Sequence, residues 1–372
     1  AAFALLHIKG RTPVTKLLEG PMPVEKKYNL GTKGQGFREG GHEGLPRFSK
    51  AAFSGEYPFG TIRLTDPDVP LRARVTGFNP FIPLDTINSG IPCAILEYEF
   101  TNRSKRRVQY EFSYHLSHLA GGAGNGMGRS SRNEVIPGGV HLFNTEPEGS
   151  EHSASASLTV VGHRPVVKAM WFRGGWFDSI SALWREVSTG AFKANKGEDA
   201  ARNGGRNGGS ILLKGSLGPG ESAVYPIIIT WHFPNCHYEA RRVNVKTAAQ
   251  GCCDEPTWRP FYASQWDNAA EVAAYVHGNY ASLRSRTQGF HDALFKSSLP
   301  SYVIVAVSAN LAILKSPTLL LQENGNAWAW EGCFVNNGCC AGTCTHVWNY
   351  AQALPHLYPQ LERTFRETEL ER

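Results

Sequence analysis

Residues 93–119, CAILEYEFTNRSKRRVQYEFSYHLSHL, contain two runs in which apolar and polar side chains alternate. A polar turn at residues 102–105 separates the two runs. The apolar members are Leu96, Tyr98, Phe100, Val108, Tyr110, Phe112, Tyr114 and Leu116. A period of two is typical of β-strands that bury one face, so this stretch predicts an antiparallel hairpin.

Further strands are expected on both sides of this stretch. A second hairpin is predicted from residues 211–213 and 224–231, with a glycine-proline turn between them. Short strands with Gly/Pro turns predict an antiparallel β-sandwich, which we assign to residues 1–240 with its start missing. Residues 194–209 are polar and rich in glycine, and they predict a long exposed loop. The other strand candidates are residues 59–64, 71–78, 156–161 and 166–172.

The periodicity changes after Pro234. Between Trp266 and Leu294, apolar side chains recur at alternating intervals of three and four, which predicts one face of a long helix. We therefore expect a linker at residues 241–260 and a helical domain at residues 261–372. Further helices are predicted at residues 301–314, 345–357 and 360–370.

The composition is that of a folded protein with little net charge. The chain has 372 residues, 39 glycines, 22 prolines and a net charge of +6. It has no dense basic block, which argues against a nucleic-acid partner. No apolar run reaches the roughly 18 residues of a transmembrane helix, and residues 1–6 lack the basic flank of a signal peptide. The eight cysteines are too sparse for a disulfide scaffold. We expect reduced thiols, a cytoplasmic location and no cofactor.

The stretch from Trp328 to Leu354 combines glycines, thiols, an imidazole and three tryptophans. A nucleophilic Cys344 beside His346 would need a thiolate next to a base. Tryptophan faces with His and Glu would suit the rim of a sugar site, and buried packing at a helix start is equally compatible. A metal site is disfavoured because zinc ligands usually come in pairs with two to four residues between them. Its ligands would be Cys333, Cys339, Cys340, Cys344 and His346.

The run from Gly342 to Leu370, GTCTHVWNYAQALPHLYPQLERTFRETEL, is the longest of several motifs that point to one family. Together the motifs resemble glycoside hydrolase family 116, which includes non-lysosomal glucosylceramidases (bile-acid β-glucosidases) and microbial β-glucosidases and β-xylosidases. The resemblance implies a β-sandwich followed by an (α/α)6 barrel. It also implies a retaining mechanism with two carboxyl groups about 5–5.5 Å apart. The other motifs are residues 56–59, 66–71, 77–85, 229–235, 266–267, 290–294 and 314–318.

The resemblance also predicts what this chain contributes. Residues 266–372 suffice for about four or five helices at about 12 residues each, too few to close such a barrel. We therefore expect part of a longer β-glucosidase or glucosylceramidase-like enzyme, cut at both ends, whose partner is the rest of the catalytic domain. Its catalytic carboxylates are expected beyond Arg372.

Residue roles follow from the same comparison. The residues predicted to contact a β-linked glycoside are Trp330, Glu331, His346 and Trp348, and no metal site is assigned. The late glutamates are interpreted as a solvated helix face beside Arg363 and Arg366; they are Glu362, Glu367, Glu369 and Glu371. His232 and His237 are interpreted as structural. The alternative function is a non-catalytic carbohydrate-binding or structural sandwich module, which would bind sugar without turnover.

Overall fold

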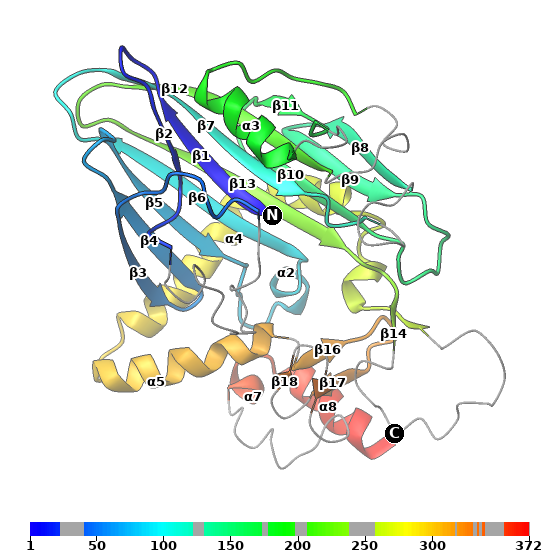
Figure 1. Cartoon of the computed structure of the whole chain (residues 1–372). Coiled ribbons are helices and arrows are strands. Elements are labelled where there is room, and N and C mark those ends of the chain that lie inside the picture. The colour runs from blue at the N-terminus through cyan, green and yellow to red at the C-terminus, as the bar shows by residue number, and fades with distance from the viewer. Residues whose placement is uncertain are drawn as a thin grey trace.

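In the computed structural model, two antiparallel β-sheets pack face to face, and helices lie on their outer faces and at one end (Figure 1). The five-stranded sheet has the order β11-β12-β7-β1-β2, and the eight-stranded sheet has the order β3-β4-β5-β6-β13-β10-β9-β8.

The structure describes residues 1–22, 41–121, 130–172, 178–197, 207–237, 257–316, 318–329, 333–334, 337–338 and 353–371. The strands are β1 Ala2–Ile8, β2 Val14–Leu17, β3 Lys50–Glu56, β4 Phe59–Thr65, β5 Leu71–Phe78, β6 Cys93–Asn102, β7 Val108–Ser117, β8 Ser131–Ile136, β9 Gly139–Asn144, β10 Ser155–Val160, β11 Val166–Lys168, β12 Gly208–Leu217 and β13 Ser222–His232. The prediction of antiparallel strands followed by helices is confirmed.

The core between the sheets is built around aromatic rings. Phe100 and Phe112 face each other from opposite sheets with ring centroids 5.2 Å apart. Tyr225 packs against Phe112 at 5.5 Å, and its hydroxyl lies 2.8 Å from that of Tyr110. Large rings contribute much of the apolar area that drives folding, and the paired hydroxyls satisfy each other in the buried layer.

The two predicted hairpins are wrong in their pairing, although all four strands form. β6 pairs with β5 and β13, whereas β7 pairs with β1 and β12 in the other sheet. The turn from β6 to β7 therefore crosses from one sheet to the other, and so does the turn from β12 to β13. Alternation reports only that a strand buries one face. The alternation pattern is the same whether the next strand lies beside the first strand in one sheet or opposite it across a core about 10 Å thick.

Asn102 joins these two crossing turns. Its side chain is 1% exposed, and Nδ2 donates to the carbonyl oxygens of Arg106 (2.7 Å) and Leu217 (2.9 Å). Its Oδ1 accepts hydrogen bonds from both the backbone N–H and the hydroxyl of Ser104. One amide therefore satisfies groups on both turns.

The predicted exposed loop at residues 194–209 is wrong at its end. Gly208 and Gly209 are buried in β12, and Asn207 is buried as well. A Cβ at Gly208 would lie 2.4 Å from the Leu116 carbonyl oxygen and 2.7 Å from the Trp171 ring. The glycines therefore permit close packing rather than chain flexibility, and a glycine-rich composition does not distinguish the two.

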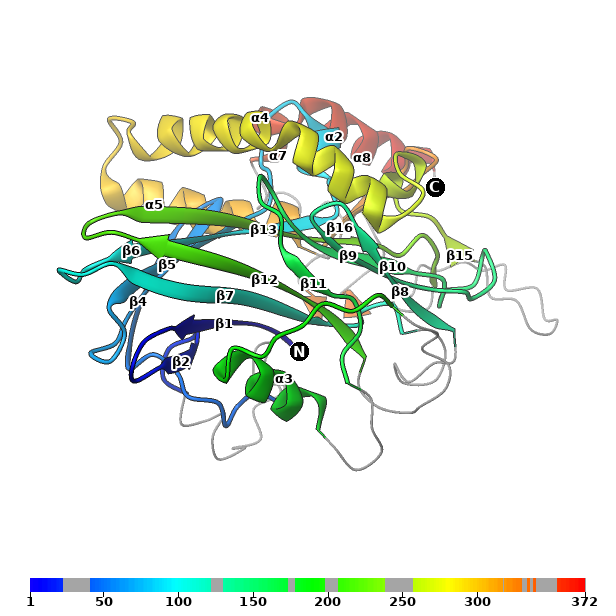
Figure 2. The same cartoon turned by 90° about the horizontal axis from the view of Figure 1, so that it is seen from above.

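Two helices cover the outer faces of the sandwich, one on each side (Figure 2). α4 (Ala269–Phe295) packs on the eight-stranded sheet through Val272, Val276 and Leu283, which confirms the predicted helical stripe. Asn268 caps its start by accepting from the N–H groups of Ala270 and Glu271. α3 (Ser179–Ser188) packs on the five-stranded sheet through Ile180, Leu183 and Val187.

Most of the remaining described elements follow α4. They include α5 Ser301–Leu311, the hairpin of β16 Leu319–Leu321 with β17 Ala327–Ala329, the two-residue strands β18 Cys333–Phe334 and β19 Asn337–Gly338, α7 Leu354–Leu357 and α8 Pro359–Glu371, while the short strands β14 Cys236–His237 and β15 Thr257–Trp258 precede α4. These bounds agree with the predicted helices at residues 301–314 and 360–370. None of the helices in the described ranges is both long and apolar enough to cross a membrane. The division at residues 240 and 260 stays a prediction.

Candidate functional site

The four residues predicted to contact sugar lie outside the described ranges: Trp330, Glu331, His346 and Trp348. The structure does describe the elements directly before and after them. β17 ends at Ala329, one residue before Trp330, and α7 begins at Leu354. The described residues that flank these four positions form an apolar cluster, which we call the frame.

The frame is an apolar cluster where the sandwich meets the last helices. Ala327 and Ala329 of β17 pack with Phe81 from the loop after β5 and with Leu354 and Tyr358. The Ala327 N–H donates to the Thr368 hydroxyl of α8 at 3.3 Å. The Leu84 N–H donates to the Leu357 carbonyl at 2.8 Å, so the sandwich loop and α7 are joined directly. The motif at residues 77–85 and the motif ending at residue 370, far apart in sequence, thus form one structure.

Lys315 lies beneath this frame, lining a pocket of about 100 Å³. Its Nζ donates to the carbonyl oxygens of Pro80 (3.3 Å) and Ser89, the last residue of α2 (Thr86–Ser89). Burial lowers the pKa of this amine to about 8, while burial raises the pKa of the neighbouring Cys93 thiol to about 12. Because two carbonyl groups engage the amine, we assign it a structural role at the end of the helix. Sequence reasoning missed it, although a single cation after the apolar residues 311–314 was a visible signal.

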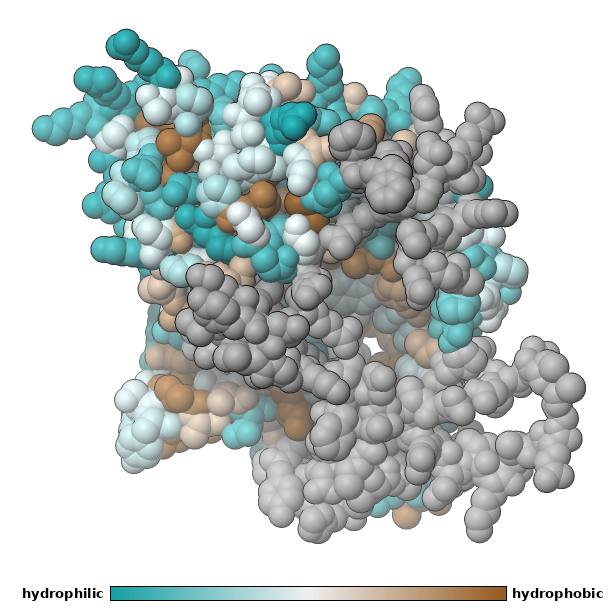
Figure 3. Space-filling view, viewed as in Figure 1, coloured by the Kyte–Doolittle hydropathy of each residue, from teal (hydrophilic) through white to brown (hydrophobic). Residues whose placement is uncertain are grey.

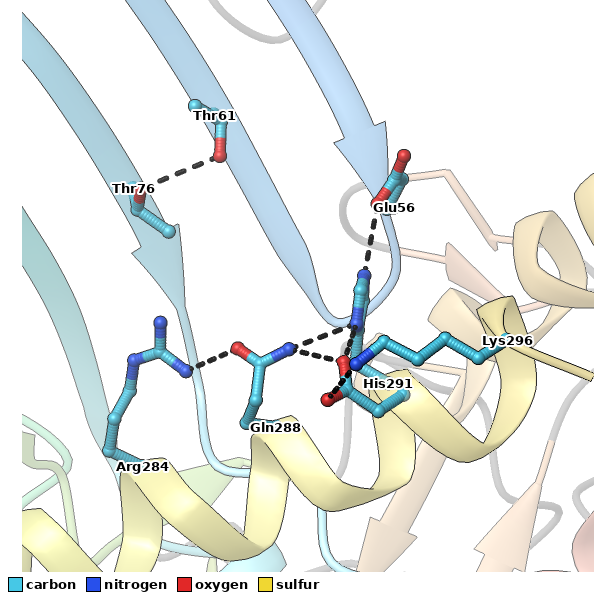
Figure 4. Close-up of polar contacts among 8 residues, drawn as sticks. Glu56, Thr61, Thr76, Arg284, Gln288, His291 and Lys296 are labelled. Atoms are coloured by element: carbon cyan, nitrogen blue, oxygen red, sulfur yellow. Dashed lines mark hydrogen bonds and ion pairs between the residues drawn. The ribbon is translucent and has the colours of Figure 1, made fainter.

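A polar network joins α4 to the edge of the eight-stranded sheet (Figure 4). His291 reaches from α4 to Glu56 at the end of β3, with Nε2 3.0 Å from Oε2, and its Nδ1 lies 3.0 Å from the Asp292 carboxylate. Lys296 donates to Asp292 at 2.8 Å. Hydrogen bonds from Lys296, His291 and Gln288 lower the pKa of the Asp292 carboxyl. A general acid needs a raised pKa instead, which argues against that role for Asp292.

The same network continues along α4 to the middle of the sheet. Arg284 donates to Glu97 of β6 at 2.8 Å, and the Tyr280 hydroxyl donates to the same carboxylate oxygen at 2.6 Å. Arg284 also lies over the Phe59 ring at 4.6 Å from its centroid. The motifs at residues 56–59 and 290–294 therefore meet at this junction.

The late glutamates behave as the sequence predicted. Arg366 contacts Glu362 at 2.8 Å and Glu369 at 3.5 Å along α8. These are pairs at i,i+4 and i,i+3 on a partly exposed helix face, which is the geometry of ordinary helix ion pairs. The interpretation of these glutamates as a solvated face is confirmed for Glu362 and Glu369.

A polar cleft of about 540 Å³ lies where β9, β10 and β13 meet the start of α4. His141 and Phe143 of β9 line it, stacked with ring centroids 4.9 Å apart. His232 lines it from the end of β13, and burial lowers the pKa of this imidazole. His232 was interpreted as structural from sequence, because it lies near the predicted domain junction. Arg259, Asp267 and Glu148 also line the cleft.

The histidines, cysteines and carboxylates of the described residues include no group of three that could hold a metal ion. Cys333, Cys339, Cys340, Cys344 and His346 have no described side chains, so the disfavoured metal reading of that segment stays untested.

The comparison with protein families matches residues 2–283 to the model described as beta-glucosidase 2, glycosyl-hydrolase family 116 N-term. The match spans the whole sandwich and most of α4, so it includes the helix that covers the eight-stranded sheet. The matched region, the sandwich with the first part of α4, thus falls in one class, the glycoside hydrolases. The chain belongs to glycoside hydrolase family 116, as the motifs predicted.

Solved structures with partial similarity are also carbohydrate-active proteins. They include a protein described as a kojibiose phosphorylase from the human microbiome (9% identity, TM-score 0.34, covering 68% of this chain and 26% of that one). Another is a polysaccharide lyase (14% identity, TM-score 0.32, covering 63% of this chain and 26% of that one). A third is a family 36 α-galactosidase from Geobacillus stearothermophilus (8% identity, TM-score 0.24, covering 50% of this chain and 26% of that one). The chain spans about a quarter of each of these proteins, and similarity this low carries no weight beyond the family match. A search of curated proteins gave no match.

Proposed function

We propose that this chain forms the N-terminal sandwich and the first catalytic-domain helices of a retaining β-glycosidase. The substrate class is β-glucosides, with glucosylceramide-like lipids or β-xylosides as variants. The observation that carries the proposal is the family match across residues 2–283. Trp330, Glu331, His346 and Trp348 are proposed to line the sugar pocket.

The retaining reaction needs a nucleophilic carboxylate and a second carboxyl group that protonates the leaving oxygen. We place neither of them in this chain. Two helical carboxylates are engaged in ion pairs, Asp292 of α4 with Lys296 and Glu362 of α8 with Arg366. The proposed role of the chain is to support the barrel through the frame at Phe81, Ala327 and Tyr358.

The activity test compares two proteins. The complete gene product that contains this chain is expected to hydrolyse an aryl β-glucoside or β-xyloside with retention of configuration, whereas residues 1–372 alone are expected to be inactive. Adding the separately expressed remainder to residues 1–372 should restore turnover. Absence of hydrolysis by the complete product contradicts the glycosidase proposal. Turnover by residues 1–372 alone contradicts only our placement of the acids.

The outer face of α5 supports a partner in the rest of the catalytic domain. Tyr302 is 75% exposed and Val305 is 61% exposed, and hydrophobic surface extends over α5 at the lower left of Figure 3. Fully burying one large apolar side chain contributes about 1.5–3 kcal/mol. We propose that this face packs against further helices of the barrel.

We predict that residues 1–372 alone self-associate through α5. The double variant Tyr302→Glu, Val305→Lys places an ion pair at i,i+3 and should raise the dissociation constant of the self-associated species at least about tenfold, which corresponds to about 1.4 kcal/mol. Sedimentation velocity across a concentration series measures this. Phe53→Lys on the edge strand β3 is the control, because Phe53 is comparably exposed. A monodisperse unmodified chain, or an equal effect of the control, contradicts the prediction.

A further inference from the structure

Two buried histidines in the polar cleft each have a ring nitrogen without a partner. His141 is 6% exposed and His232 is 5% exposed, and the Nε2 atom of each is buried with no hydrogen bond within the described structure. Both residues line the same cleft. An unsatisfied buried polar atom costs about 1–3 kcal/mol, so two of them facing one cleft suggest a site that a ligand completes.

The surroundings determine what each Nε2 can accept or donate. The Nδ1 of His141 lies 2.9 Å from Glu134 Oε1 on β8. A carboxylate only accepts hydrogen bonds, so Nδ1 carries the proton and Nε2 of the neutral ring is an acceptor. His232 is held by a hydrogen bond to the Trp266 backbone, and burial favours its neutral form. The cleft therefore presents two acceptors that match hydroxyl donors.

Strand register sets the separation of the two imidazoles. His232 pairs with Ser155 of β10, and Ser155 pairs with Phe143 of β9. His141 lies two residues from Phe143 on the same outer face, since the residues between and before them, Leu142 and Val140, point into the sandwich core. Two strand spacings across the sheet and two residues along the strand place the two Cα atoms roughly 12 Å apart. The acceptors are thus spread across the cleft, as they would be to contact separate hydroxyl groups of one ligand.

The charges of the cleft restrict the ligand further. Asp267 and Glu148 carry carboxylates at the cleft, which disfavour an anion, and Arg259 is already paired with Glu323 at 2.9 Å. A bound metal is disfavoured because the described residues offer no group of three ligands there. A volume of about 540 Å³ falls within the range of small-molecule sites. Amide groups of Asn144 and Asn235 add neutral polar lining.

We propose that this cleft is a binding site for a neutral saccharide unit, whose hydroxyl groups donate to Nε2 of His141 and Nε2 of His232. This role needs no hydrolysis and does not depend on where the catalytic carboxylates lie. It assigns to the sandwich a carbohydrate contact in addition to its support of the barrel.

The first test uses residues 1–372 without substitution. Imidazole nitrogens of the histidine-labelled protein are followed by long-range ¹H–¹⁵N NMR while methyl β-D-glucopyranoside is added. The Nε2 signals of His141 and His232 are expected to move together with one saturation curve, and that of the exposed His163 is expected to stay unchanged. No movement at saturating glycoside overturns the proposal. Movement with zinc ions alone also overturns it, because the cleft would then be a metal site.

The second test uses ring-preserving variants. His141→Phe and His232→Phe each remove one acceptor. Each is expected to raise the dissociation constant for the same glycoside at least tenfold. His163→Gln is the matched control, since His163 lies outside the cleft and contacts the Val224 carbonyl. Unchanged affinity in both cleft variants, with folding confirmed by their NMR spectra, overturns the proposal. If either variant does not fold, the spectra of the unsubstituted protein decide the question.

Discussion

Lowering the pH from 6.5 to 3 is expected to reduce the free energy of unfolding by about 4 kcal/mol through one imidazole, that of His115 in β7. His115 is fully buried on the outer face of the five-stranded sheet, with the Phe3 ring stacked on it at 4.8 Å. Its Nδ1 lies 2.7 Å from the Ser210 hydroxyl, and its Nε2 lies 2.9 Å from that of Ser113.

The direction of the effect follows from proton uptake. Burial, with a smaller contribution from the nearby Lys168, lowers the pKa of His115 from 6.5 to about 3 in the folded protein. Between these two values the unfolded chain binds a proton that the folded chain does not, so acid favours unfolding. Above pH 6.5 both states are neutral and the effect is absent. Each pKa unit corresponds to about 1.4 kcal/mol. Because the unfolded group is half-protonated at pH 6.5 and the folded group at pH 3, the change between these two pH values is about 4 kcal/mol.

The measurement is urea unfolding at a series of pH values for the unsubstituted protein and for His115→Gln, which keeps polar atoms near both serines but does not titrate. Other groups contribute to acid unfolding in both proteins, so the informative quantity is the difference between their free energies of unfolding. This difference should grow by several kcal/mol in favour of the variant as the pH falls below 6.5. His163→Gln, at an exposed histidine, should follow the unsubstituted protein. Parallel curves for His115→Gln would contradict the prediction.

The second large effect is expected at Asn102, which joins the two turns that cross between the sheets. Asn102→Leu keeps the side-chain size but removes the amide that donates to the buried Leu217 carbonyl, whereas the exposed Arg106 carbonyl still accepts from the Ser104 hydroxyl. Each unsatisfied buried group costs about 1–3 kcal/mol. We therefore expect the free energy of unfolding to fall by about 3 kcal/mol, measured by urea unfolding at pH 7.

Ser104→Ala is the matched control for Asn102→Leu. It removes the hydroxyl that donates to Asn102 Oδ1 but leaves both Nδ2 bonds in place. Its cost should stay near 1 kcal/mol, the usual net value of one hydrogen bond. Equal costs for the two variants would show that Asn102 does not join the turns.

The candidate site was predictable only in part. The family motifs identified the segments that build the frame, and the structure brings residues 77–85 together with the region around Tyr358. The interpretation of Glu362 and Glu369 held because i,i+4 geometry is local to one helix. The roles of His232 and Lys315 were not visible, since each depends on groups far away in sequence, such as Pro80 for Lys315. The predicted sugar contacts at Trp330, Glu331, His346 and Trp348 stay predictions.

The sequence by itself determined the kind and place of several main elements, although it did not identify β1, β8, β9 or α3. Alternation identified β6 and β7, the three-four spacing identified α4, and the ordered motifs identified the family, because periodicity and motif order are properties of neighbouring residues. Only the tertiary structure decided that β6 and β7 lie in opposite sheets, that Gly208 is buried against Trp171, and that His141 and His232 face one cleft. These features depend on contacts between distant parts of the chain, and the same local pattern satisfies hydrophobic burial in more than one pairing.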